Sequence, residues 1–309
     1  MLSVEKDVIF YVLIATTIDS EGLESILFEF DKVNLNFQVV VIENGEKGNS
    51  EYIVNKFKGR LSLSFIYTNI KGKSHALNLA LKSIPDDSFI FFTDDDVKIS
   101  EDLILSYKYA IKKYGRGYYF GGEMKVEYEV EPEDWLKKFL PVSALGWKYC
   151  PNEHNLKYFF GCNWGAFKSD LDRAGEFNTD LGPGSSTGAT GQESDMQKRL
   201  FANNIRPIYI EKAWVTHYVP VSRCNYKWAL KRRYKDGKQS GINDNFLDVS
   251  RTFLGYPVAI IKELMIRLPI FVYCKVFLSK EKSAVVIFDF YYRFGRMVGH
   301  KYRRKSSLL

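Results

Sequence analysis

The chain has 309 residues, of which 46% are hydrophobic and 16% aromatic, so it can bury a large core and is not globally disordered. Its net charge of +7 admits an anionic partner, such as a nucleotide, a nucleic acid or a membrane surface. The four cysteines show no paired spacing, which argues against a disulfide framework or a zinc site and favours a reducing compartment. Residues 1–7 are charged and lack the order of a secretory signal.

Strand-like and helical patterns alternate as far as Tyr114. Short apolar or β-branched runs predict strands, and apolar residues three or four positions apart predict helices. The predicted strands cover 8–15, 37–42, 63–68 and 89–93, and the predicted helices cover 21–33, 50–57, 74–83 and 101–114. Strands that alternate with helices form right-handed crossovers, so we expect an α/β fold with a mostly parallel central sheet flanked by helices.

The pattern changes after Gly115. Residues 118–130 alternate as in a strand, and residues 161–167 are a second strand candidate. A glycine-rich segment, 182–191, precedes a predicted helix over 193–203. Residues 208–215 predict a late strand that ends at His217. We therefore expect one domain over residues 1–225.

A basic region with helical patterns follows from residue 226 to residue 309. Its segment 256–278 is apolar but interrupted by Lys262, Glu263, Arg267 and Lys275, so no run reaches the roughly 18 apolar residues of a spanning helix. Such a pattern predicts amphipathic helices that lie on a membrane or pack on the main domain. We therefore expect residues 226–309 to form a separate, amphipathic C-terminal extension.

The most informative segment is the predicted strand 89–93, which runs directly into Asp94, Asp95 and Asp96. Like-charged carboxylates repel one another and resist burial, so three at one strand end need a cation or water. In an open α/β sheet, ligands bind at the carboxyl ends of the strands. The triplet therefore predicts a site for Mg²⁺ or Mn²⁺ with a phosphate-bearing substrate, and the alternative is a solvated acidic turn.

Four further segments carry candidate functional groups, and each has an ordinary structural alternative. Glu43 could accept a hydrogen bond from a base, although Glu-Asn-Gly also suits a turn. Lys73 lies near a helix start, where it could meet a phosphate or simply be exposed. Glu193 and Asp195 lie at the start of a predicted helix. They could cap that helix, or one of them could act as a general base. His217 could join a metal site or be an ordinary polar residue.

The order of these pieces resembles glycosyltransferase family 2, whose members have the GT-A fold. The resemblance covers about residues 8–240 and rests on motifs taken together. These are Thr16-Thr17, Glu43-Asn44-Gly45, Gly72 to Asn78, the DXD-like Asp94-Asp95-Asp96, Gly161 to Phe167, Gly175 to Gly184 and Gly191-Gln192-Glu193-Ser194-Asp195. The resemblance implies transfer of a sugar from a UDP- or GDP-linked donor to a hydroxyl, with inversion at the anomeric carbon.

The resemblance and the residues together predict individual roles. The donor-binding residues are expected to be Thr16, Glu43, Lys73, Asp94 and Asp95, and the ligands of Mn²⁺ or Mg²⁺ are expected to be Asp96, Asp94 and His217. Glu193 falls where many members have the catalytic Asp of a Glu-Asp pair, but this chain has Gln192-Glu193, so Asp195 is the alternative base. The implied acceptor is a glycan or a lipid-linked molecule in surface polysaccharide, glycolipid or glycoprotein synthesis, at the cytoplasmic face of the cell membrane.

Two other classes of protein stay open. A nucleotidyltransferase has a similar sheet and metal-binding acids, but it would want a glycine-rich basic segment after the first strand, where this chain has residues 16–20. A non-enzymatic protein could use the basic, aromatic C-terminal region to bind nucleic acid or anionic lipid. The adjoining apolar segment has no use in nucleic-acid binding, so we expect peripheral contact with an anionic membrane and no nucleic-acid partner.

Overall fold

The computed structural model describes residues 8–17, 21–151, 158–244 and 251–306, which divide into two compact units. The sheet unit comprises residues 1–127, 146–185 and 192–218, and the helical unit comprises residues 128–145, 186–191 and 219–309. The sheet unit has the α/β architecture that the alternating pattern predicts.

A seven-stranded sheet forms the centre of the sheet unit, in the order β3-β2-β1-β4-β8-β6-β9. The strands are β1 (Phe10–Thr16), β2 (Gln38–Asn44), β3 (Ser62–Thr68), β4 (Phe89–Thr93), β6 (Tyr118–Gly121), β8 (Trp164–Phe167) and β9 (Arg206–Tyr209). Among these strands only β8 runs antiparallel to its neighbours, so the sheet is mostly parallel, as expected.

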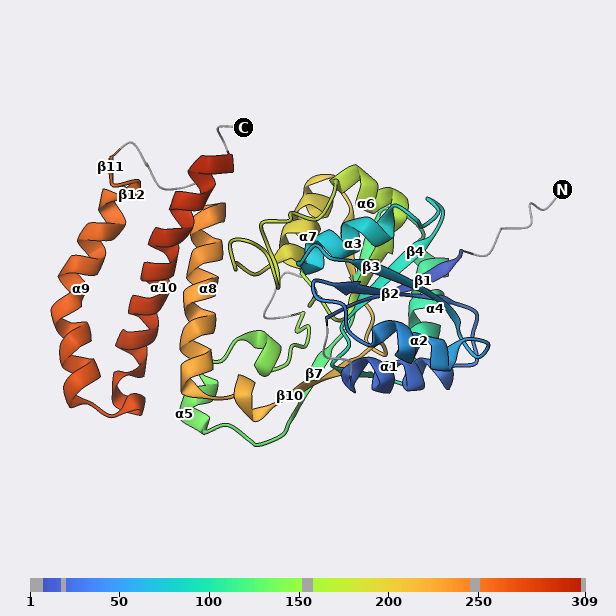
Figure 1. Cartoon of the computed structure of the whole chain (residues 1–309), viewed down its shortest axis with the longest axis horizontal. Coiled ribbons are helices and arrows are strands. Elements are labelled where there is room, and N and C mark those ends of the chain that lie inside the picture. Colours follow the sequence, from blue (N-terminus) through green and yellow to red (C-terminus); the bar gives the residue numbers. More distant parts are fainter. Residues whose placement is uncertain (1–7, 18–20, 152–157, 245–250, 307–309) are drawn as a thin grey trace. The chain divides into compact units, whose positions relative to one another are not determined.

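Helices cover both faces of this sheet (Figure 1). One face carries α1 (Glu21–Asp31), α2 (Ser50–Phe57) and α4 (Leu103–Tyr114), and the other carries α3 (Lys73–Leu81), α6 (Lys168–Ala174) and α7 (Gln192–Ala202). Val12 and Ile14 of β1 belong to the first cluster of buried side chains, whereas Leu13 belongs to the second. Because both faces are buried, the central strands have continuous apolar runs.

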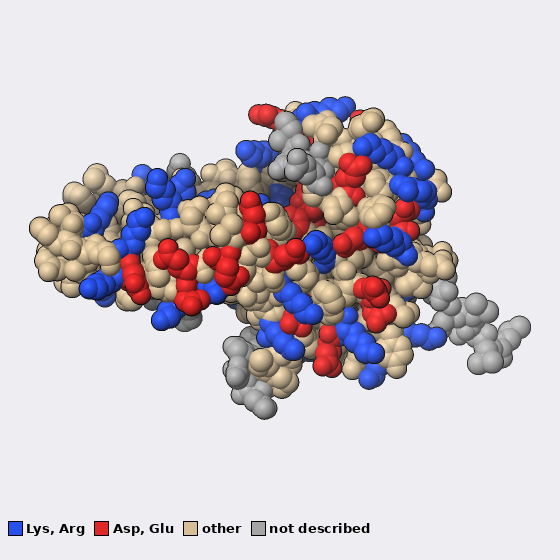
Figure 2. Space-filling model, turned by 90° about the horizontal axis from the view of Figure 1, so that it is seen from below, with Lys and Arg blue, Asp and Glu red and all other residues tan. Residues whose placement is uncertain are grey.

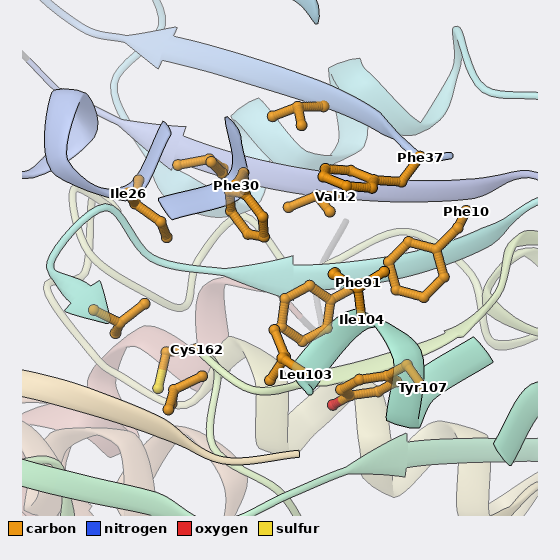
Figure 3. Close-up of a cluster of buried hydrophobic side chains, with 14 of the residues drawn as sticks. Phe10, Val12, Ile26, Phe30, Phe37, Phe91, Leu103, Ile104, Tyr107 and Cys162 are labelled. Carbon is orange, nitrogen blue, oxygen red and sulfur yellow. The ribbon is translucent and has the colours of Figure 1, made fainter. Parts of the chain in front are cut away.

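Figure 3 shows the first cluster, in which side chains from the helices pack against β1, β2 and β4. Phe91 of β4 and Tyr107 of α4 are both fully buried, with ring centroids 4.8 Å apart. This packing fixes β4 at the centre of the sheet, so the residues that follow β4 emerge at a defined place.

A second, three-stranded sheet has the order β5 (Val97–Ile99), β10 (Val215–Val219) and β7 (Met124–Tyr128). This sheet corrects two predictions. Residues 118–130, predicted as one strand, form β6 and β7 in different sheets, and the late strand predicted over 208–215 is replaced by β9 and β10, which also lie in different sheets. A turn in which the Ala213 N–H donates to the Ile210 carbonyl at 3.1 Å redirects the chain between β9 and β10. His217 consequently lies within β10, paired with Val97, and not at the end of a strand.

The helical unit contains the helices predicted for the C-terminal region. They are α8 (Tyr226–Asn243), α9 (Val258–Phe277) and α10 (Lys280–Ser306). The unit also contains α5 (Asp134–Lys137), which that prediction did not cover, short 3₁₀ turns at Val142–Ala144 and Val221–Arg223, and a small hairpin of β11 (Thr252–Phe253) and β12 (Tyr256–Pro257). Across the described residues, no helix has both the length and the apolar composition needed to cross a membrane.

Glycines bring α8 and α10 into backbone contact. A Cβ at Gly237 would lie 2.0 Å from the Tyr292 carbonyl oxygen, and one at Gly295 would lie 2.0 Å from the Tyr234 carbonyl oxygen. Gly241 and Gly299, four residues further along each helix, meet in the same way, since a Cβ on either would lie 3.0 Å from the Cα of the other. This Gly-x-x-x-Gly spacing on both helices therefore sets how closely they pack.

Gly299→Ala is expected to destabilise the helical unit. A Gly→Ala change within a helix usually stabilises by up to about 1 kcal/mol because alanine has the higher helix propensity. At Gly299 the added methyl would lie 2.1 Å from the Lys238 carbonyl oxygen, so we expect a loss of about 1–3 kcal/mol instead. Thermal denaturation of the full chain measures the effect, with Ser240→Ala as the control on α8. A higher Tm for Gly299→Ala would contradict this packing.

Candidate functional site

The carboxyl ends of β1, β2 and β4 lie at one edge of the sheet, because these strands are adjacent and parallel. The register pairs Thr16 with Glu43 and Ile14 with Thr93. Two residues beyond Thr93 comes Asp95, which is therefore level with Thr16. The Thr16 hydroxyl donates a hydrogen bond to the Asp95 carboxylate, so the acidic triplet is anchored to the end of β1.

Asp95 is enclosed by protein and by like charges. Burial raises the pKa of its carboxyl to about 6, the hydrogen bond from Thr16 opposes this shift, and the charges of Asp96 and Asp94 add to it. Helix α1 comes close to the same turn: a Cβ at Gly22 would lie 2.3 Å from the Asp95 carbonyl oxygen. Glycine at position 22 therefore allows α1 to pack against the acidic turn.

The Asn44 side chain connects the end of β1 to the start of α3. Its Nδ2 donates to the Thr16 carbonyl oxygen at 2.8 Å, and its Oδ1 accepts from the Gly72 N–H at 2.9 Å. Gly72 has a φ of 137°, a conformation that residues with a side chain rarely adopt. These two bonds and this glycine place Lys73 at the edge of the sheet.

Lys73 joins two acids from distant parts of the chain. Its Nζ lies 2.5 Å from Asp94 Oδ1 and 3.0 Å from Glu193 Oε1. Burial lowers the pKa of the ammonium, but the charges of Asp94 and Glu193 and their hydrogen bonds outweigh burial and raise the pKa well above its ordinary value. Lys73 is therefore a permanent positive charge between an acid that follows β4 and an acid in the first turn of α7.

Glu193 has a second donor and little spare room. Its Oε1 also accepts from Gln192 Nε2 at 2.6 Å, and a Cβ at Gly161 would lie 2.3 Å from the same oxygen. Cys162, which follows Gly161 in the sequence, is buried. Burial, together with the charges of Asp94 and Asp96, raises the pKa of its thiol. The thiol therefore stays neutral. Through its contact with Lys73, Glu193 is the acid by which α7 is linked to the aspartate triplet.

Asp195, the alternative base, has a different partner. Arg199 Nε donates to Asp195 Oδ2 at 3.0 Å, and Arg199 Nη2 donates to the Glu176 carbonyl oxygen at 3.0 Å. Asp195 thus takes part in the packing of α7 against the end of α6, whereas Glu193 contacts Lys73. The structure thus gives different contacts to Glu193, the first candidate base, and Asp195, its alternative.

Asp96 and His217 are brought together by the pairing of β5 with β10. The Tyr218 N–H donates to the Asp96 carbonyl oxygen at 3.1 Å, and His217 Nε2 lies 3.3 Å from Asp96 Oδ2. His217 Nδ1 is buried and has no hydrogen-bond partner among the described residues. Across residues 8–17, 21–151, 158–244 and 251–306, no group of three or more His, Cys, Asp or Glu side chains could hold a metal ion by itself.

Glu43 is placed differently from the expectation that it meets a base. Its side chain is fully buried, and its two carboxylate oxygens accept hydrogen bonds from the Gly48 and Ser50 N–H groups, the latter at 3.2 Å. In this arrangement Glu43 holds the turn before α2, because it satisfies amides that the start of a helix leaves without partners. A contact with a base would in addition require access to this buried carboxylate.

Sequence reasoning missed several residues that position the site. Gly22 lay outside every motif, whereas Asn44, Ser74, Asn78 and Gly161 lay within motifs of the resemblance but were given no positioning role. Ser74 and Asn78 hold the segment before the glycine-rich loop. Ser74 Oγ donates to the Leu181 carbonyl at 2.8 Å, and Asn78 exchanges two hydrogen bonds with the Phe177 backbone. The available signal was two polar residues four positions apart on a helix face that is otherwise apolar.

A family model supports the resemblance seen in the motifs. Residues 22–173 match the model described as Glycosyl transferase family 2. No curated protein matches the chain.

Several solved structures share the fold at low sequence identity. The mannosyltransferase PcManGT from Pyrobaculum calidifontis, in complex with GDP-Man and Mn²⁺, is 14% identical with a TM-score of 0.52 over 96% of this chain and 86% of that chain. S. aureus TarS 1-349 in complex with UDP-GlcNAc is 14% identical with a TM-score of 0.54 over 97% and 91% of the two chains. GalNAc-T7 with UDP, GalNAc and Mn²⁺ is 11% identical with a TM-score of 0.50 over 77% and 51%. These likenesses confirm the expected GT-A fold.

Lys73→Met is expected to destabilise the sheet unit, and more so as the pH rises. Without the ammonium, the carboxylates of Asp94 and Glu193 repel each other wherever both are ionised, so the folded state is penalised more at high pH than at low pH. Removing one partner of a buried ion pair costs about 3–5 kcal/mol, and the partial exposure of both acids reduces this to about 2 kcal/mol.

Urea denaturation of this variant at about pH 5 and about pH 8 tests the charge effect. Lys56→Met is the control, because Lys56 forms an exposed pair with Glu24 at 3.0 Å and its loss should leave the midpoint unchanged. Equal midpoints for Lys73→Met and the unmodified chain at both pH values would show that Lys73 does not neutralise these acids.

Proposed function

We propose that this glycosyltransferase, which carries a family 2 domain over residues 22–173, transfers a sugar from a UDP- or GDP-linked donor to a hydroxyl at the acidic edge of its sheet. The transfer inverts the anomeric configuration and depends on Mn²⁺ or Mg²⁺. The donor class is supported by PcManGT and TarS, which share the fold and were solved with GDP-Man and UDP-GlcNAc.

The observation that carries this proposal is the position of Lys73 between Asp94 and Glu193. In a single displacement the leaving group departs from one side of the anomeric carbon while the acceptor approaches from the other. The reaction therefore needs two acids near the anomeric carbon: one that faces the donor, and a second that acts as the base for the acceptor hydroxyl. One ammonium contacting Asp94 from the β4 end and Glu193 from α7 provides that arrangement.

Asp96 and His217 fit a divalent cation that is shared with a diphosphate. A carboxylate and an imidazole are both ligands that such ions accept, and His217 Nε2 lies 3.3 Å from Asp96 Oδ2, so one cation could contact both side chains. Two protein ligands leave the other positions to phosphate oxygens and water, as is common for Mg²⁺ with phosphate substrates. Bound there, the cation would offset the negative charge of the departing nucleoside diphosphate.

Asp94 has a different place in this proposal from the one that the resemblance implies. Its Oδ1 is already engaged by Lys73, so we propose that Asp94 holds Lys73 and faces the donor, and that Asp96 and His217 are the principal metal ligands. Thr16 keeps Asp95 in place at the end of β1, and Glu43 supports the turn before α2. Thr16 and Glu43 thus support the backbone and the carboxylates around the proposed donor site.

Glu193 accepts the proton of the acceptor hydroxyl while that oxygen bonds to the anomeric carbon. The bond from the anomeric carbon to the diphosphate oxygen breaks, and the nucleoside diphosphate leaves with the electron pair. Lys73 Nζ, 3.0 Å from Glu193 Oε1, orients the carboxylate that takes this proton. Inversion needs no second carboxylate, unlike retaining glycoside hydrolysis, in which a carboxylate attacks the sugar.

The family match favours this reaction over nucleotidyl transfer, which the sequence left open. The two reactions differ in product, since glycosyl transfer releases a nucleoside diphosphate and nucleotidyl transfer releases pyrophosphate. We further propose a glycan or lipid-linked acceptor at the cytoplasmic face of the membrane. The family resemblance and the basic helices of the C-terminal region support that assignment.

Asp96→Asn and His217→Ala are each expected to lower Mn²⁺-dependent release of nucleoside diphosphate by about 100-fold, because each removes a ligand of the cation. Release is measured with a panel of UDP- and GDP-linked sugars, with and without EDTA, and added Mn²⁺ should restore the activity lost on chelation. Asp102→Asn, at an exposed acid before α4, is the control. Full activity in EDTA would rule out the metal-dependent mechanism.

Glu193→Gln is expected to lower kcat by about 10²–10⁴-fold with little change in the KM for the donor, because it removes the base but keeps the shape of the side chain. Asp195→Asn should lower kcat by about tenfold or less, since Asp195 pairs with Arg199. Initial rates at saturating donor measure both variants, and thermal denaturation checks that each is folded. The opposite ranking would assign the base to Asp195.

A further inference from the structure

Helix α9 has an exposed apolar side along most of its length. Its packed side contains Ile260, Leu264 and Cys274, which are buried, and Phe271, whose ring stacks on Phe290 of α10 with centroids 4.1 Å apart. The opposite side presents Met265, Ile266, Ile270, Tyr273, Val276 and Phe277, all exposed. We call these six residues the α9 face.

Lys262 is the charged residue of α9 that lies on this outward side, and the other charged residues turn elsewhere. Two of them turn toward α10: Glu263 Oε2 lies 2.5 Å from Arg293 Nη1, and Arg267 Nη1 lies 3.4 Å from Asp289 Oδ2. Lys275 Nζ lies 5.6 Å from the centroid of the packed Phe271 ring. Figure 2 shows the end of the helical unit at its left, where the outermost tip is tan and several Lys, Arg, Asp and Glu side chains lie just behind it.

Such a distribution is the reverse of an ordinary surface helix, which turns its charges to water and its apolar residues to the protein. Leaving large apolar side chains such as Ile266 and Phe277 in water is unfavourable, and a contiguous exposed patch of this kind marks an interaction surface. The α9 face is therefore expected to be covered when the protein acts.

The charge of the surrounding sequence indicates what covers it. Residues 258–306 contain 11 Lys and Arg but 3 Asp and Glu. Lys280 and Lys282 lie three and five residues after Phe277, in the first turn of α10, and Val285 just beyond them is also exposed. Aromatic and aliphatic groups next to lysines suit the boundary of a bilayer, where the rings enter the acyl region and the ammonium groups reach lipid phosphates.

We propose that the helical unit docks on an anionic phospholipid surface, with α9 in the headgroup layer and the α9 face in contact with the acyl chains. A second copy of the chain is the less suitable occupant. A two-fold contact would bring two strongly basic helix pairs together and would place Lys262, the charged residue left on the outward side, against apolar residues. At a bilayer, by contrast, Lys262 can extend to a phosphate.

Co-sedimentation of the full chain with vesicles tests the proposal. The vesicles are phosphatidylcholine alone or with about 30 mol % phosphatidylglycerol. The double variant Ile266→Ser/Phe277→Ser changes side chains that are 79% and 71% exposed, and we expect it to weaken binding to the anionic vesicles by about tenfold or more. The matched control is Leu105→Ser/Tyr109→Ser on α4, at positions 52% and 71% exposed, which should leave binding unchanged.

A charge variant tests the lipid headgroup separately. Lys280→Glu/Lys282→Glu should weaken binding to the anionic vesicles by about tenfold and should reduce their advantage over phosphatidylcholine, whereas Lys112→Glu/Lys113→Glu on α4 should do neither. Thermal denaturation confirms that each variant folds, which is expected because all of the replaced side chains are exposed or lie at the surface of their helix.

Three outcomes would overturn the proposal. These are no binding to either vesicle, equal loss of binding in the α9 and α4 serine variants, or a dimer in light scattering that the α9 serine variant converts to a monomer. The last outcome would assign the α9 face to a second copy. Since the readout is binding and not sugar transfer, these results are independent of whether the proposed reaction is correct.

Discussion

The acidic edge of the sheet depends on one buried positive charge. Burial alone would favour a neutral Lys73, but Asp94 and Glu193 reverse this effect and keep the ammonium charged. The same charge lets two carboxylates from segments 99 residues apart in the sequence lie close together without prohibitive repulsion. The position of Lys73 follows from Asn44, which connects the end of β1 to Gly72, so the electrostatics of the site depend on backbone hydrogen bonds.

Glycine supplies the space that this arrangement needs. At Gly22 and Gly161 an added Cβ would lie 2.3 Å from the Asp95 carbonyl oxygen and the Glu193 carboxylate, respectively. The same physical device recurs in the helical unit, where Gly237 and Gly299 let α8 and α10 touch through their backbones. In both units, glycines therefore set how closely two elements approach each other.

The two units distribute charge in different ways. In the sheet unit, charged groups such as Asp94 and Lys73 are gathered at the edge of a sheet and neutralise each other there. In α9, Glu263 and Arg267 pair with α10, so apolar residues are left outside. The first arrangement suits recognition of a small, highly charged donor. The second leaves an apolar side of α9 exposed, which is the feature on which the proposed membrane contact rests.

The sequence by itself determined the alternation of strands and helices, the strand at Phe89–Thr93 and the presence of an acidic cluster after it, because these follow from local pattern. Only the tertiary structure decided that Glu193 and not Asp195 contacts Lys73, that His217 lies beside Asp96, and that Glu43 turns to the amides before α2. The direction of a side chain depends on strand register and helix phase. Those are fixed by contacts between distant segments, which no local pattern contains.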